Sequence, residues 1–140
     1  MFEISTNIIL DGITLALHSA YPASHIHGEE VSQGLKPGDF IVKLVTAQQK
    51  PITKARMQRI PAFDVLYFPK AGKIECCKIG DALCETLELI TLPGGGKIRG
   101  GDMCFEIIDG ILHFHVCYGH VIRCDEARIN MEGYALKQGG

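Results

Sequence analysis

Residues 102–123, DMCFEIIDGILHFHVCYGHVIR, carry the strongest local signal in the chain and decide its fold class. Asp109-Gly110 separates two apolar stretches, and this dipeptide favours a type I′ turn because both central residues need a positive φ. The pattern predicts a long C-terminal β-hairpin, with one strand over 102–108 and the other over 111–123. Alternate residues of the second strand would form its buried face: Leu112, Phe114, Val116 and Tyr118.

Two segments have the periodicity of amphipathic helices. Residues 4–20 place apolar side chains at steps of three and four, and Pro22 ends this helix because the residue before proline avoids the α region. Residues 74–90 repeat the spacing from Cys76 to Ile90, with charged residues on the remaining faces.

Two further strands are predicted between these helices. Residues 40–46 alternate in the manner of a half-buried strand, and residues 56–68 form a second extended stretch. Pro61 cannot donate to a ladder, so we expect a bulge or an edge position there. We interpret residues 47–54 as a polar loop and residues 25–30 as a short edge strand.

The order of elements predicts an α+β fold. Helices and strands do not alternate strictly, so we expect two helices packed on one face of a mainly antiparallel sheet. A chain of 140 residues fits one domain, which we place at 1–130. Residues 131–140 have no periodicity and are predicted to be a flexible tail.

Composition excludes several classes of function. The formal charge of -2, from 14 basic and 16 acidic residues, argues against a polybasic nucleic-acid module, so direct nucleic-acid recognition is not expected. The chain has neither an apolar run long enough for a membrane span nor the features of a signal peptide. We therefore expect a cytosolic protein with no membrane partner, whose six cysteines are reduced.

One group of residues is a candidate metal site. His113, His115 and Cys117 are two residues apart, so a strand would place them on one face, where Cys104 of the partner strand could complete a tetrahedral zinc site. The alternative, which we favour, is that this face meets solvent or another subunit. Neither a nucleophile motif nor a phosphate-binding loop is present, so we expect no enzyme activity and no cofactor.

The distribution of charge indicates a possible contact between copies. Residues 40–63 contain five basic residues and no acidic one, whereas the helix at 74–90 carries four acidic residues and one lysine. Such surfaces can match head to tail between copies. The alternative, which charge alone favours, is that both are simply solvated faces. The candidate interface residues are Lys50, Lys54, Arg56, Arg59, Glu85 and Glu88.

Four segments in this order resemble the tail terminator proteins of phages and defective prophages of Gram-positive bacteria, a group related to phage-like bacteriocins. They cover about residues 4–124 and are TNIILDGITLALHSAYP, HGEEVSQGLKPGDFIVKLV, RIPAFDVLYFPK and RGGDMCFEIIDGILHFHVCYGHVIR. The succession of FDVLYFP, a helix and EIIDGILHFHV is the most specific part of the resemblance.

The resemblance implies a structural role in virion assembly. Proteins of this kind cap the tail tube, stop its polymerisation and offer a surface for head joining. It implies a hexameric ring of copies, with the tail tube protein and head–tail connector proteins as partners in the virion tail. The alternatives are a head–tail connector or tail-completion subunit and, in another class, a small metal-binding or regulatory domain.

Overall fold

The computed structural model describes residues 4–28 and 35–123. In these ranges, two helices accompany a six-stranded sheet and a separate two-stranded sheet. The elements in chain order are α1 Thr6–Ala20, β1 Ile26–His27, β2 Phe40–Thr53, β3 Arg56–Tyr67, α2 Lys73–Thr86, β4 Leu89–Thr91, β5 Lys97–Arg99, β6 Gly101–Ile108, β7 Ile111–Cys117 and β8 His120–Arg123. The predicted division of the chain at residue 130 lies outside the described residues.

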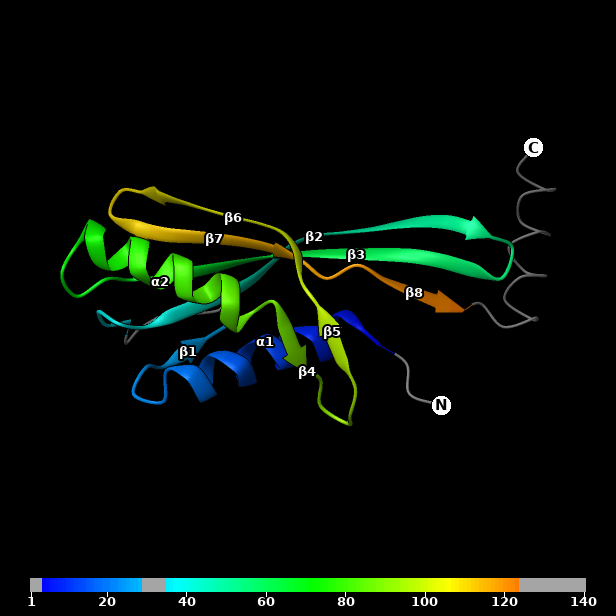
Figure 1. Cartoon of the computed structure of the whole chain (residues 1–140), viewed down its shortest axis with the longest axis horizontal. Coiled ribbons are helices and arrows are strands. Elements are labelled where there is room, and N and C mark those ends of the chain that lie inside the picture. Colours follow the sequence, from blue (N-terminus) through cyan, green and yellow to red (C-terminus); the bar gives the residue numbers. More distant parts are fainter. Residues whose placement is uncertain (1–3, 29–34, 124–140) are drawn as a thin grey trace.

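The large sheet is mixed and mostly antiparallel. Its strands lie in the order β1-β2-β3-β7-β6, and β8 also pairs with β3. Only β1 and β2 run parallel among the pairs of this sheet in the described residues. Figure 1 shows α1 and α2 on the same side of the sheet. The predicted α+β class with two helices is confirmed.

The core lies between the helices and one face of the sheet. Phe63 and Val65 of β3 point to the same face as Phe114 and Val116 of β7, because these residues pair directly across the two strands. All four are fully or almost fully buried. The helices supply the facing side chains, among them Ile9, Ile13, Leu17, Cys76 and Leu83.

The predicted long hairpin is not confirmed over its full length. β6 and β7 pair across Asp109-Gly110, whose φ angles of 51° and 78° match the predicted turn. However, β7 ends at Cys117, and β8 pairs with Arg56–Arg59 of β3 instead of with β6. β7 and β8 pair with β3 in the same register and are separated only by Tyr118 and Gly119. The amide of Tyr118 donates to the carbonyl of Pro61, and its side chain is fully buried.

The predicted polar loop at 47–54 is wrong. β2 continues to Thr53 and pairs with β3 from Phe40↔Tyr67 to Thr53↔Arg56, so this segment is one side of a long β-hairpin. Its side chains are exposed on both faces of the strand, and the alternation of apolar and polar residues that marks a half-buried strand is therefore missing.

Two other predicted boundaries also change. The helix predicted to Ile90 ends at Thr86, and Ile90 instead lies in β4, which forms a small hairpin with β5 across Gly94–Gly96. Pro61 lies in a central strand, at the point where pairing of β3 passes from β7 to β8. The expected irregularity occurs in the partner strand, between Leu44 and Thr46. The short edge strand predicted at 25–30 is present at Ile26–His27.

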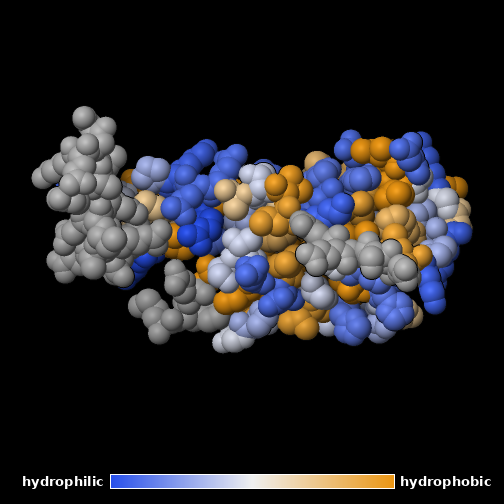
Figure 2. Space-filling view, turned by 180° about the vertical axis from the view of Figure 1, so that it is seen from behind, coloured by the Kyte–Doolittle hydropathy of each residue, from blue (hydrophilic) through white to orange (hydrophobic). Residues whose placement is uncertain are grey.

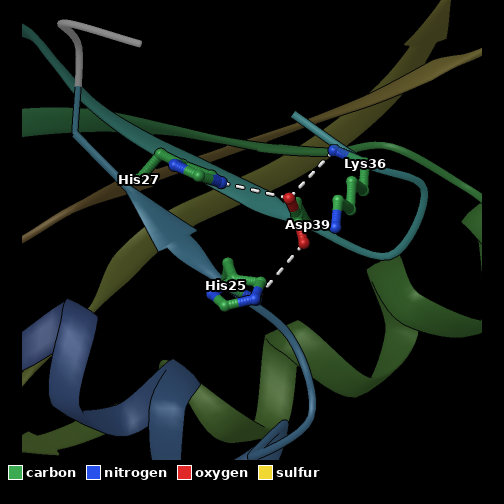
Figure 3. A network of polar contacts seen from close by, with 4 residues as sticks. All are labelled: His25, His27, Lys36 and Asp39. Carbon is green, nitrogen blue, oxygen red and sulfur yellow. Dashed lines mark hydrogen bonds and ion pairs between the residues drawn. The ribbon is translucent and has the colours of Figure 1, made fainter. Parts of the chain in front are cut away.

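A buried carboxylate fixes the start of β2. Asp39 is 3% exposed and accepts hydrogen bonds from the backbone amides of His25 and Lys36, at 3.3 and 2.9 Å. Its Oδ2 atom also lies 3.1 Å from Nε2 of His27, as Figure 3 shows. Burial alone would raise the pKa of Asp39, but these contacts together outweigh it and lower the pKa.

Candidate interaction surfaces

The paired ends of β2, β3 and β8 form a basic arm, defined here as residues 46–60 and 120–123. Figure 1 shows α2 against one end of the sheet and the tip of the β2–β3 hairpin projecting at the opposite end. The arm carries five cationic side chains and no aspartate or glutamate. The cations are Lys50, Lys54, Arg56, Arg59 and Arg123.

The predicted interface cations of the arm differ in their freedom to bind a partner. Lys50, Lys54 and Arg56 are exposed. Arg59 is partly buried, and its Nε and Nη2 atoms donate to Oε1 of Gln49 across the hairpin, at 3.1 and 2.9 Å. Arg59 therefore helps to hold the two strands together, whereas the three exposed cations are available at or near the tip.

An acidic surface lies on the solvent side of α2 and just after it. Asp81 and Glu85 are four residues apart and thus neighbours on the helix, and both are exposed. Glu88, also exposed, lies 2.8 Å from Nη1 of Arg99. That ion pair is exposed at both ends and contributes little to stability, so Glu88 can exchange Arg99 for another cation.

Glu75 differs from the other acidic residues of α2 because it serves the fold. Its carboxylate accepts hydrogen bonds from the Tyr67 hydroxyl at 2.6 Å and from the amides of Lys70 and Ala71, at 2.8 and 3.1 Å. The Tyr67 hydrogen bond is the largest influence on this carboxylate, whose pKa is lowered. Glu75 thus joins β3 to the start of α2 and is not part of the acidic surface.

The histidines of β7 face away from the helices. His113, His115 and Cys117 alternate with the buried residues of the strand, so they share a face as predicted. Their near neighbour is Asp64 of β3, whose carboxylate oxygens lie 3.5 Å from Nδ1 of His113 and 3.2 Å from Nδ1 of His115. Within residues 4–28 and 35–123, no cluster of three or more potential ligands has the arrangement of a metal site.

Analysis of the sequence missed an apolar groove between α1, the end of α2 and β4. Its volume is about 480 Å³, and its walls include Leu15 and Ala20 of α1 together with Thr86 and Leu89. Leu15 is 53% exposed and Leu89 is 45% exposed, which is high for apolar residues so close together. The sequence signals were Leu15 and Leu89, which lie outside the apolar stripes of the two predicted helices.

The arm and the body of the molecule differ in the hydropathy of their surfaces. Figure 2 shows hydrophilic residues over the arm, at the left of the view, and hydrophobic residues reaching the surface over the middle of the body.

None of the helices within the described ranges has the length and apolar character to cross a lipid bilayer.

Comparison with known proteins identifies the family. No curated protein matches the chain. One solved structure, of a protein without a descriptive name, aligns with a TM-score of 0.46 and 8% identity, covering 88% of this chain and 98% of its own. A family model described as phage tail terminator protein matches residues 8–128. Because that match spans most of the chain, this protein belongs to the phage tail terminator family, whose members are structural and not catalytic.

Proposed function

We propose that this protein caps the end of the phage tail tube, stops its polymerisation and presents a surface for head joining. The observation that carries the proposal is the family match over residues 8–128. The partners would be further copies of the chain, the tail tube protein and the head–tail connector proteins. Assembly would take place in the cytoplasm of the host bacterium, and the finished protein would remain in the virion tail.

The physical requirement for a cap is a ring with two unlike faces. One face must fit the last ring of the tube, and the other must not bind a further tube ring. We propose a hexameric ring in which the arm of each copy contacts the next one. Support comes from the basic arm and the acidic surface, which lie on different parts of one molecule and form no ion pair with each other among the described residues. A head-to-tail contact of this type closes into a ring when the rotation between copies allows it.

Removing the protein from the producing phage or prophage tests the proposed function. Electron micrographs should then show tails of irregular and excessive length, because nothing blocks further addition to the tube. Tails of normal length without heads would contradict the terminator role and favour a head–tail connector or tail-completion subunit. Restoring the wild-type chain should return the original length distribution.

A charge-reversed arm tests whether the arm takes part in assembly. In Lys54→Glu/Arg56→Glu both changes lie on exposed residues at the tip, so we expect normal unfolding but weaker ring formation and a broader tail-length distribution. Lys73→Glu/Lys97→Glu is a matched control, because it reverses two exposed lysines on the body. Unchanged sedimentation and tail length in the arm variant would show that the arm is not a contact.

A further inference from the structure

The apolar groove requires a partner of a particular chemistry. Its walls are largely apolar, and Leu15 and Leu89 expose about half of their side chains to water. Exposed apolar residues that gather in one hollow are typical of a contact site. An occupant must therefore supply at least one exposed apolar side chain.

The rim of the groove is negatively charged on the side of α2. Thr86 and Leu89 line the groove, and each directly follows an exposed glutamate, Glu85 or Glu88. Asp81 extends the acidic surface by one helical turn. The occupant should accordingly carry cations beside its apolar side chain, and acidic residues close to it would be unfavourable.

The tip of the arm has this combination. Ile52 is 53% exposed and lies at an irregularity in the pairing of β2 with β3, between Pro51 and Thr53. Two residues away on either side are Lys50 and Lys54, and both are exposed. Nothing acidic occurs in residues 40–63, so the tip meets the charge requirement of the rim.

The tip cannot reach the groove of its own molecule. β2 and β3 pair from the body of the sheet to the tip, with two register shifts on the way, which makes the arm an extension of the sheet. The groove is formed by α1, the end of α2 and β4, and Figure 1 shows these elements against the body, away from the tip. The partner that the geometry fits is therefore a second copy of this chain.

We propose that Ile52 of one copy inserts into the apolar groove of the next, while Lys50, Lys54 and Arg56 pair with Asp81, Glu85 and Glu88 at its rim. The inference rests on the proposed function, because it names the contact that would join the copies of the ring. Each copy offers one arm tip and one groove, so the contact is heterologous and propagates around the ring.

A charge exchange tests the ionic part of the contact. Lys54→Glu/Arg56→Glu and Asp81→Lys/Glu85→Lys should each weaken self-association by about tenfold or more. The chain that combines all four changes restores opposite charges across the contact, and its assembly should recover. Sedimentation of the purified chains and tail lengths in particles made with each variant give two independent readouts.

A steric test addresses the groove directly. Ser19 lines the groove and is exposed, so Ser19→Trp should fill it and produce overlong tails without lowering the stability of the monomer. His18→Trp is the matched control, since His18 is exposed in the same helix and does not line the groove. Ile52→Ser should resemble Ser19→Trp, because it removes the side chain that the groove receives.

The outcomes separate this inference from the proposed function. Two results together support the contact. The variant with all four charge changes should recover self-association, and Ser19→Trp, but not His18→Trp, should produce overlong tails. No recovery, or normal tails with a filled groove, overturns the contact while the terminator role stands. Normal tail length in the complete absence of the protein would instead overturn the proposed function.

Discussion

The hydroxyl of Tyr118 donates a 2.6 Å hydrogen bond to the backbone carbonyl of Leu87. Tyr118 lies between β7 and β8, and Leu87 is the C-terminal cap of α2. Both side chains are fully buried. One contact thus connects the end of α2 with the junction between β7 and β8, and burial raises the pKa of Tyr118 far above its usual value.

Tyr118→Phe should lower the free energy of unfolding by about 1–3 kcal/mol, because the Leu87 carbonyl loses a partner in a place that excludes water. Urea unfolding at neutral pH measures the effect. Tyr21→Phe is the control, since the hydroxyl of Tyr21 makes no hydrogen bond among the described residues, and it should change stability much less. Equal effects of the two substitutions would show that the Tyr118 hydrogen bond contributes nothing specific.

The Asp39 network predicts a pH dependence of stability. The folded protein holds the pKa of Asp39 below its unfolded value of about 3.9, so the stabilisation is complete above that value. It is then lost as the pH falls through the lower folded pKa. Asp39→Asn should cost about 1.5–3 kcal/mol at pH 7, because Asn presents an amide group where the carboxylate accepts hydrogen bonds.

Unfolding of the wild-type chain and Asp39→Asn at pH 7, 5 and 3 checks this expectation. The difference in the free energy of unfolding between the two chains should be constant from pH 7 to 5 and should become smaller toward pH 3. Asp11→Asn provides the comparison, because Asp11 is exposed on α1. A difference that stays constant down to pH 3 would argue against ionisation of Asp39 as its source.

The close contact between α2 and β6 leaves no room for a side chain at Gly80. A Cβ atom at Gly80 would lie 2.8 Å from three ring atoms of Phe105. Alanine would favour the helix by about 1 kcal/mol, but overpacking costs about 1–3 kcal/mol, so we expect Gly80→Ala to be destabilising. In Gly80→Ala/Phe105→Leu, the smaller side chain at position 105 should restore part of the stability that Gly80→Ala loses.

Thermal unfolding of both variants measures these effects, with Gly28→Ala as the control because nothing lies within 4 Å of its added Cβ. If Gly80→Ala raised the melting temperature, the helix and the strand would have to be further apart than described.

Adjacent cysteines on α2 should react very differently with alkylating agents. Cys76 is fully buried, and burial is the main cause of its raised pKa, followed by the charge of Glu75. Cys77 is exposed. Iodoacetamide at pH 7.5 should therefore modify Cys77 well before Cys76, because only the thiolate reacts.

Mass spectrometry of peptides from a labelling time course distinguishes the two positions. Cys104, which is also exposed, should follow Cys77, whereas Cys84 and Cys117 should lag, since burial raises the pKa of both. Faster reaction at Cys76 than at Cys77 would mean that α2 presents a different face to the sheet.

The sequence alone determined the elements whose signals are local. Asp109-Gly110 specified its turn because both residues must adopt positive φ. The apolar spacing of residues 4–20 predicted a helix and its buried side, and this helix is α1, which begins at Thr6. The alternation around Phe114 identified the buried face of β7. The family resemblance rested on these same segments and is confirmed.

Only the tertiary structure decided which partners the remaining segments take. Residues 47–54 became a strand because β3 supplies hydrogen bonds along their whole length, although no apolar face marks them. β8 pairs with β3 in the register of β7, whereas pairing of β6 with β7 ends at Gly101 and Cys117, so only β3 accompanies the end of the predicted hairpin strand. The groove likewise depends on where α1, α2 and β4 meet. Local periodicity reports the side of an element that is buried, but contacts between distant segments depend on packing that no short stretch of sequence contains.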